Sequence, residues 1–191
     1  MTVPSVLDLA EHWGVIEATS RGVHRAKLAT VAPDGWYRII RPPAGVEPSR
    51  TLAFARQQIG DAYGFFTIAS IALDILPPHW FKWPLRFRTT RTWICSALGA
   101  ESLRAGGWIH QWPTIYGVYP SEVMHALLVT GGVEIELATA RPGDVGFSHN
   151  TGIIAAGIRF TQRKTPTAAV DHMFIVERFT PTQITTLHPA A

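Results

Sequence analysis

Residues 92–107, TWICSALGAESLRAGG, have the pattern of a helix. Four apolar residues recur in it at helical spacing: Ile94, Ala97, Leu98 and Leu103. Two glycines at 106 and 107 are typical of a helix end. The sequence therefore predicts a helix over Thr92–Ala105. The first turn of this helix holds Cys95, the one cysteine of the 191 residues.

Helical spacing also occurs on both sides of this stretch. We expect a helix that begins near residue 49, capped by Ser49, and another after Pro120, capped by Ser121. The apolar run Phe65–Leu76 is interpreted as a further helix, and residues 77–91 as an ordered, tryptophan-bearing loop.

Strand patterns lie near the two ends of the chain. The N-terminal pair is expected at Trp13–Thr19 and Gly35–Pro43, and the C-terminal strands at residues 141–148, 170–179 and 183–188. Strands at both ends and helices in the middle predict one α+β domain over residues 1–191, with an antiparallel sheet packed against helices.

Composition sets limits on the partners of the chain. The net charge of +3 is scattered along the sequence, and no basic stripe or groove-reading motif accompanies it, so a nucleic-acid partner is not expected. The longest apolar run, residues 64–76, is interrupted by Asp74 and is too short for a membrane span. The N-terminus lacks a signal-peptide pattern. We therefore expect a protein that is cytoplasmic on synthesis, or carried by a phage particle or a secretion machine.

Cys95 has the position of a reactive thiol. The N-terminus of a helix favours a thiolate through its free amide groups and its dipole. A nucleophile also needs a histidine and a third polar group that orients the imidazole. His172 opens the apolar strand HMFIV, and Glu17 is flanked by apolar residues in VIEAT. Asp171 is a weaker orienter, because neighbours in a strand point to opposite faces.

Each of these residues also has an ordinary structural interpretation. Cys95 alone is typical of a small buried side chain, His172 of a hydrogen-bonded one, and Glu17 of a solvent-facing one. Five other histidines show no metal-ligand spacing: His24, His79, His110, His125 and His149. We expect neither a metal nor a cofactor.

Several segments together resemble the NlpC-like papain-fold cysteine hydrolases, and most closely their circularly permuted YiiX-like branch. The segments are RPGDVGF (141–147), GIIAAGIRFTQR (152–163), DHMFIVE (171–177), VIEATSRGVHRAKL (15–28) with WYRIIRP (36–42), FARQQIGDAYGF (54–65), WICSALGAESLRAGGW (93–108) and VYPSEVMHALL (118–128). They cover most of the chain. The resemblance implies a papain-like, circularly permuted fold.

The order of these segments departs from that branch. Here the Glu17 strand comes first, Cys95 lies in the centre and His172 follows, as if the permuted chain had been cut between its histidine and glutamate strands. Such a cut restores the order of the unpermuted enzymes, whose third group is often a histidine on the next strand. His188, sixteen residues after His172, therefore rivals Glu17, which we favour because more of its surroundings match.

The resemblance implies a Cys95–His172–Glu17 triad that hydrolyses an amide through an acyl-enzyme. Tyr63 and Ser96 are the expected oxyanion or substrate contacts. The family implies two substrate classes, a peptidoglycan peptide or a lipid-like acyl amide, with a phage tail or secretion apparatus as a delivery partner. The alternative is a binding or structural module that retains the fold without using the site.

Overall fold

The computed structural model describes residues 13–64, 91–110, 118–149 and 170–178. Their largest element is a six-stranded antiparallel sheet in the order β2-β1-β8-β7-β3-β6. The strands are β1 (Trp13–Thr19), β2 (Gly22–Lys27), β3 (Tyr37–Arg41), β6 (Val133–Ile135), β7 (Val145–Ser148) and β8 (His172–Arg178). Short strands β4 (Ala62–Tyr63) and β5 (Thr92–Trp93) form a separate parallel pair.

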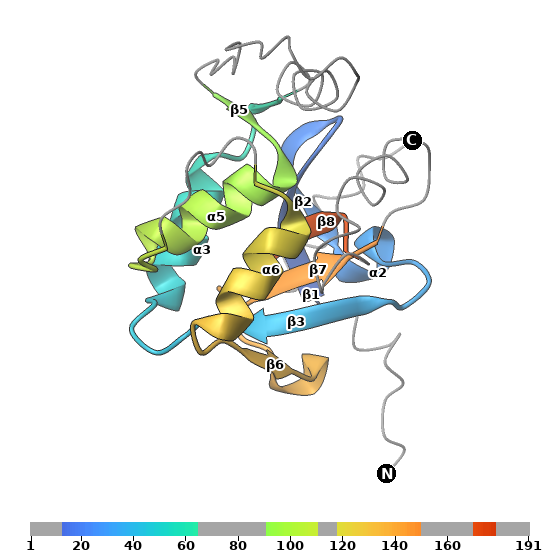
Figure 1. Cartoon of the computed structure of the whole chain (residues 1–191). Helices are drawn as coiled ribbons and strands as arrows, with labels where there is room; N and C mark the ends of the chain where they lie inside the picture. Colours follow the sequence, from blue (N-terminus) through green and yellow to red (C-terminus); the bar gives the residue numbers. More distant parts are fainter. Residues whose placement is uncertain (1–12, 65–90, 111–117, 150–169, 179–191) are drawn as a thin grey trace, which may run out of the picture.

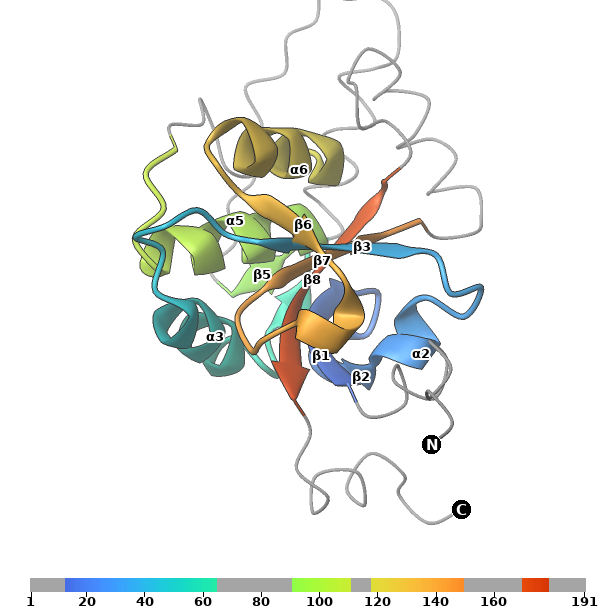
Figure 2. The same ribbon diagram turned by 90° about the horizontal axis from the view of Figure 1, so that it is seen from below.

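Helices cover one face of the large sheet, as Figures 1 and 2 show. They are α3 (Pro48–Gln57), α5 (Cys95–Ala105) and α6 (Pro120–Val129). The short helix α2 (Leu28–Val31) and the 3-10 turn η2 (Leu137–Thr139) lie on the opposite face. The prediction of an α+β arrangement, an antiparallel sheet packed against helices, is confirmed.

Alternation along the strands gives the sheet an apolar core on each face. On β8, Met173 and Ile175 pack with the three long helices, whereas Phe174 and Val176 pack with α2 and η2. All four side chains are at most 1% exposed. β8 is therefore buried on both faces, and a polar residue at its start is held by rigid surroundings.

The predicted N-caps of two helices are wrong. The N-caps of α3 and α6 are Glu47 and Tyr119, two residues before the predicted caps. The helices begin at Pro48 and Pro120, so Ser49 and Ser121 lie inside the first turn. Proline suits the first helical position, because its φ is already helical and its missing N–H would have no intrahelical partner there. Ser49 instead donates its hydroxyl to the Glu47 carboxylate, 3.0 Å away.

The start of α5 also differs from the prediction. Thr92 and Trp93 are extended and pair with β4, so the helix begins at Cys95. The Trp93 indole N–H donates to Asp61 Oδ2 at 3.0 Å, and its ring meets Phe54 edge-on. These contacts fix the residue two positions before the thiol and place Cys95 at the first position of the helix.

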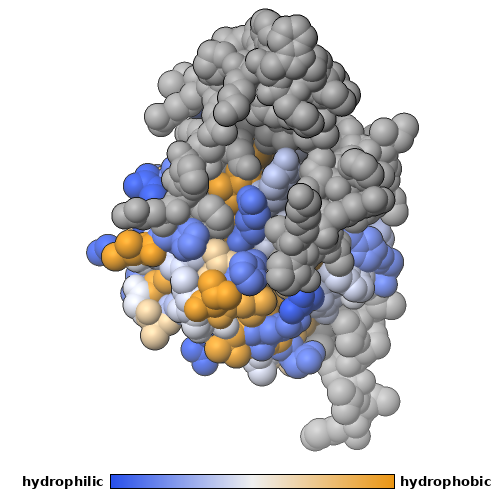
Figure 3. All heavy atoms as spheres, in the orientation of Figure 1, coloured by the Kyte–Doolittle hydropathy of each residue, from blue (hydrophilic) through white to orange (hydrophobic). Residues whose placement is uncertain are grey.

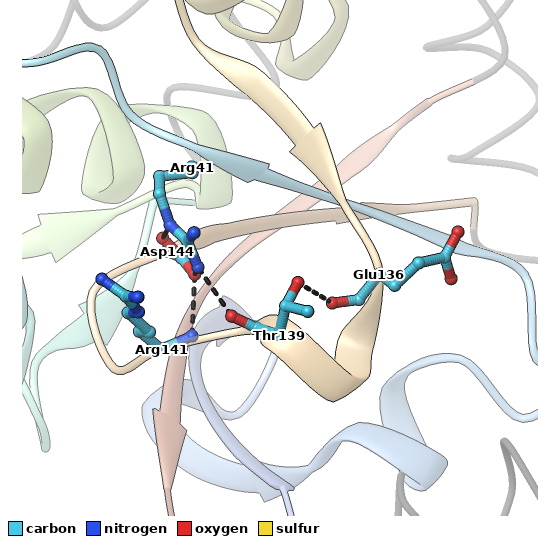
Figure 4. Close-up of polar contacts among 5 residues, drawn as sticks. All are labelled: Arg41, Glu136, Thr139, Arg141 and Asp144. Carbon is cyan, nitrogen blue, oxygen red and sulfur yellow. Dashed lines mark hydrogen bonds and ion pairs between the residues drawn. The ribbon is translucent and has the colours of Figure 1, made fainter.

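The Gly-Asp segment before β7 has a structural role. Asp144 is 1% exposed and accepts from the backbone N–H of Arg141 at 2.7 Å and from the Arg41 guanidinium at 3.1 Å. Arg41 also donates to the carbonyl of Thr139 at 2.7 Å (Figure 4). This network closes the turn from η2 into β7, the neighbour of β8.

The described surface mixes polar and apolar residues (Figure 3). Three large hydrophobic side chains are exposed in it: Ile109, Val129 and Val133. Within the described ranges, no helix has the length and apolar character needed to cross a membrane. The predicted helix at 65–76, the loop at 77–91 and the strand at 183–188 lie outside the described residues, apart from Arg91.

Candidate active site

Three segments far apart in sequence bring Cys95, His172 and Glu17 together. Cys95 begins α5, His172 begins β8, and Glu17 lies near the end of β1, which pairs with β8. Phe174, two residues after His172, is the direct partner of Glu17 in that pairing. Because His172 and Phe174 are two residues apart in β8, their side chains lie on the same face of the sheet. The His172 ring therefore reaches the Glu17 carboxylate by tilting along the strand.

The imidazole of His172 interacts with both other members of the proposed triad. Its Nε2 lies 2.7 Å from Glu17 Oε2, and the Cys95 side chain is close enough to raise the pKa of the ring. A carboxylate only accepts hydrogen bonds, so Nε2 carries the proton and Nδ1 is the nitrogen left for the thiol. This is the reverse of the ring orientation in the Ser-His-Asp template, where Nδ1 faces the carboxylate.

All three side chains are buried. Cys95 is 8% exposed, Glu17 6% and His172 3%. Burial weakens screening by water, so charges at this distance interact more strongly than they would at the surface. An ionised Glu17 at this depth requires cationic partners.

The electrostatics of the site favour ionised partners. Burial raises the pKa of Glu17, but hydrogen bonds from His172 and His24 outweigh that effect and lower it from 4.5 to about 2. Burial lowers the pKa of His172, but hydrogen bonds to Cys95 and Glu17 raise it from 6.5 to about 10. A carboxylate and an imidazolium are thus the stable forms of this pair near neutral pH.

The start of α5 leaves its first amide groups to an anion. The residue before the helix is Ile94, which has no side-chain acceptor, and the first intrahelical bond there is donated by Leu98 to the Ile94 carbonyl at 3.0 Å. The N–H groups of the first turn consequently lack intrahelical partners. They point toward the end of the helix where Cys95 lies, which suits a thiolate or a developing oxyanion.

Tyr63 lies close enough to feel the charges of the site. Burial, together with the charges of Cys95 and Glu17, raises the pKa of its phenol, which therefore stays protonated. β4 holds Tyr63 directly beside Trp93, two residues from the thiol. Ser96, the other predicted contact, is the second residue of α5 and is 2% exposed.

Glu17, one of the two candidates for the third group, lies within hydrogen-bond distance of His172. His188 lies outside the described residues. Asp171 precedes β8 and is buried, and its backbone N–H donates to the Ser148 carbonyl at 3.2 Å.

Comparisons with protein family models, curated proteins and solved structures found no match to this chain.

Sequence reasoning missed His24, whose Nε2 lies 3.2 Å from Glu17 Oε1. The signal was the hairpin that follows Glu17. Two residues, Ser20 and Arg21, connect β1 to β2, and that short turn sets the register in which Glu17 faces His24. β2 was not predicted separately, because His24, Arg25 and Lys27 interrupt any apolar alternation in GVHRAK.

Ser148 is a second residue that the sequence did not single out. It is the direct partner of His172 in the pairing of β7 and β8, so the two side chains share a sheet face. Its hydroxyl is buried and has no hydrogen-bond partner within the described part of the chain. A donor beside the imidazole is thus available to a bound water or substrate group.

Within the described ranges, no group of three or more His, Cys, Asp or Glu side chains has the arrangement of a metal site. Glu17 meets His24 with one oxygen and His172 with the other, so the two imidazoles lie on opposite sides of the carboxylate. The arrangement is suited to moving protons between side chains.

Proposed function

We propose that this chain is a cysteine hydrolase that cleaves amide bonds through a Cys95–His172–Glu17 triad. The observation that carries the proposal is the buried His172 ring, which lies 2.7 Å from Glu17 Oε2 and whose pKa is raised by the Cys95 side chain and by Glu17. A nucleophile, a base and an orienter in this sequence of contacts is the arrangement that nucleophilic catalysis needs.

The reaction would begin with the thiolate. Cys95 Sγ attacks the carbonyl carbon of the amide while its proton resides on His172. The tetrahedral oxyanion accepts hydrogen bonds from the first-turn amides of α5, with Tyr63 as a further donor. His172 then gives its proton to the leaving amine, the carbon–nitrogen bond breaks, and a thioester remains on Cys95.

Water completes the cycle. His172, now neutral at Nδ1, takes a proton from a water molecule, which attacks the thioester carbonyl. The carboxylic acid leaves, and the thiolate–imidazolium pair forms again. Glu17 stays ionised throughout and keeps Nε2 protonated, so that Nδ1 exchanges protons with thiol, amine and water in turn.

The proposal includes a papain-like, circularly permuted fold. A nucleophile at the start of a helix, with its histidine on an antiparallel strand and its third group on the neighbouring strand, is what a papain-like, circularly permuted fold would place there. The substrate classes that follow are a peptidoglycan peptide and a lipid-like acyl amide. A phage tail or secretion apparatus would deliver the enzyme to the first of these.

Activated acyl donors test the proposal without a natural substrate. We would mix the protein with p-nitrophenyl esters of N-acetyl-D-alanine and of a fatty acid, and record p-nitrophenol release together with the mass of the intact chain. We expect a burst that leaves one acyl group on Cys95, followed by slower release. The preferred ester distinguishes peptide-like from lipid-like substrates.

Two variants serve as controls. Cys95→Ala removes the nucleophile and should abolish both burst and adduct. His172→Ala keeps the thiol and should slow acylation about 100-fold or more, as expected when a positioned base is lost. Equal p-nitrophenol release from the natural protein and Cys95→Ala would contradict the proposal and favour a non-catalytic binding module.

A further inference from the structure

The second oxygen of Glu17 is held by another histidine. His24, on the neighbouring strand β2, places its Nε2 3.2 Å from Glu17 Oε1 and its Nδ1 3.0 Å from the carbonyl oxygen of Gly22. Glu17 and His24 are direct partners in the pairing of β1 and β2. The contact is therefore built into the strand register.

The hydrogen-bond partners of His24 fix its protonation state. A carbonyl oxygen and a carboxylate oxygen are both acceptors, so each ring nitrogen must donate. A neutral imidazole has only one N–H and satisfies only one of these partners. The imidazolium has two N–H groups and can donate to both acceptors. It also supplies a positive charge to the buried carboxylate.

We propose that His24 is a positioning residue of the Cys95 site, which holds Oε1 of Glu17 so that Oε2 remains on Nε2 of His172. This inference rests on the proposed function. It extends the three-residue site to a chain of four, Cys95, His172, Glu17 and His24, in which anionic and cationic groups alternate.

Burial explains why Glu17 needs a second partner. One imidazolium shared between a thiolate and a carboxylate leaves a net negative charge in a site where all three groups are at most 8% exposed. His24 neutralises that excess and binds the carboxylate oxygen that does not contact His172. Anchored at both oxygens, the carboxylate cannot turn away from His172.

The backbone around His24 is fixed as firmly as a positioning role requires. Gly22 adopts a φ of 89°, and a β-carbon at this position would lie 2.6 Å from the carbonyl oxygen of Asp61. Only glycine therefore fits. Val23 donates its N–H to that same carbonyl at 2.9 Å. Arg25, the next residue after His24, is bonded to the buried Glu177 at 2.8 Å.

His24 is also in contact with solvent, unlike His172. The exposed fraction of its side chain is 24%, against 4% for His172. The hydrogen bond to Glu17 raises its pKa above 6.5, while burial and the positive charge of Arg21 oppose that shift. Tyr63, on β4, is close enough to Glu17 for the charge of the carboxylate to help raise the pKa of the phenol. The Glu17 contact thus favours the charged form of His24, which loses one of its two hydrogen bonds as the pH rises through its own pKa.

The pH dependence of Cys95 alkylation by iodoacetamide tests this role. We would compare the natural protein with His24→Ala, which removes both the charge and the donor, and His24→Gln, which keeps one N–H donor without the charge. We expect His24→Ala to raise the midpoint of the profile, so that alkylation below the midpoint slows about 3- to 10-fold. His24→Gln should fall between the two. The control His125→Ala changes an exposed histidine on α6 and should change nothing.

The outcomes separate a positioning role from a structural one. A lower melting temperature with an unchanged midpoint in both His24 variants would overturn the inference, while the proposed function would stand. A natural protein with no thiolate below the ordinary thiol range, or one whose profile is unaffected by His172→Ala, would overturn the proposed function and this inference together.

A spectroscopic measurement keeps the inference testable if the His24 variants fail to fold. The ring signals of His24 can be titrated by NMR in the natural protein and in Glu17→Gln. We expect His24 to titrate above its ordinary value of 6.5 in the natural protein and to return toward that value in the variant. Titration at the ordinary value in both proteins would overturn the inference.

Discussion

Two buried glutamates, Glu17 on β1 and Glu177 on β8, show how similar geometry supports different roles. Each carboxylate uses one oxygen for each of two cationic partners. Glu17 binds His172 at 2.7 Å and His24 at 3.2 Å. Glu177, which is fully buried, binds Arg56 at 2.7 Å and Arg25 at 2.8 Å.

The difference lies in the chemistry of the partners. A guanidinium stays protonated at every pH that the protein meets, so the Glu177 cluster can only hold elements together. It ties β2, β8 and α3 to one another. An imidazole gains and loses protons near neutral pH, so the Glu17 cluster can take part in acid–base chemistry. Adjacent residues of β2, His24 and Arg25, serve the two clusters on opposite faces of the sheet.

The largest expected effect is on stability, from Glu177→Gln. This change leaves two arginines facing a neutral amide in a buried position, and breaking such a cluster costs about 3 kcal/mol in the free energy of unfolding. Both arginines are partly exposed and regain water, so the cost stays near the low end. Urea denaturation measures it. A cost below about 1 kcal/mol would contradict the structural role of the Glu177 cluster.

Glu17→Gln, in contrast to Glu177→Gln, should affect the acylation of Cys95 more than the stability of the protein. The amide oxygen still accepts from Nε2 of His172, but the negative charge that stabilises the imidazolium is lost. We expect acylation of Cys95 by the p-nitrophenyl donors to slow about 30-fold, equivalent to about 2 kcal/mol of activation free energy. Glu177→Gln is the matched control, since it makes the same substitution in a buried position outside the triad. Equal slowing in both variants would mean that the loss reflects folding alone.

The pH dependence of stability gives a smaller effect. The Glu17 pKa is lowered from 4.5 to about 2, so its contribution is complete above pH 4.5 and is lost as the pH falls toward 2. The His172 pKa is raised from 6.5 to about 10, so its contribution is complete below pH 6.5 and is lost as the pH rises toward 10. The contribution of the pair is therefore greatest between pH 4.5 and 6.5.

Denaturation across the pH range checks this window. From pH 6.5 to 9 we expect the free energy of unfolding of the natural protein to fall through this pair, because the unfolded chain loses the His172 proton in this range and the folded protein keeps it. The fall should be smaller in Glu17→Gln, in which His172 has lost its charged partner. It should persist in Glu177→Gln, whose partners are arginines. An equal fall in all three proteins would place the titrating group elsewhere.

The sequence predicted the elements whose signals are local. The β-favouring run around VIEAT and the apolar run HMFIV marked β1 and β8, and the two glycines after Ala105 marked the end of α5. Pro48 and Pro120 would have located the starts of α3 and α6, but the serine after each proline was predicted as the N-cap instead. Helix starts depend on which backbone groups have partners, and residue type alone records that poorly.

The contacts of the site were only partly predictable. Cys95, His172 and Glu17 were each visible as a polar group in an apolar or helix-starting context, and the resemblance grouped them. The contact of Glu17 with His24 was not predicted, because it follows from the two-residue turn of the hairpin, which the apolar patterns did not locate. The role of Glu177 was equally hidden, since its partners come from β2 and α3.

The most direct test of the triad is the rate of iodoacetamide alkylation of Cys95 against pH, in the natural protein and in His172→Ala. The chain has a single cysteine, so every adduct reports on this site. The account predicts a thiolate that persists well below the ordinary thiol pKa of about 8.5 and disappears from that range in the variant. A Cys95 that stays inert at every pH until the protein unfolds would contradict the account and identify a buried structural thiol.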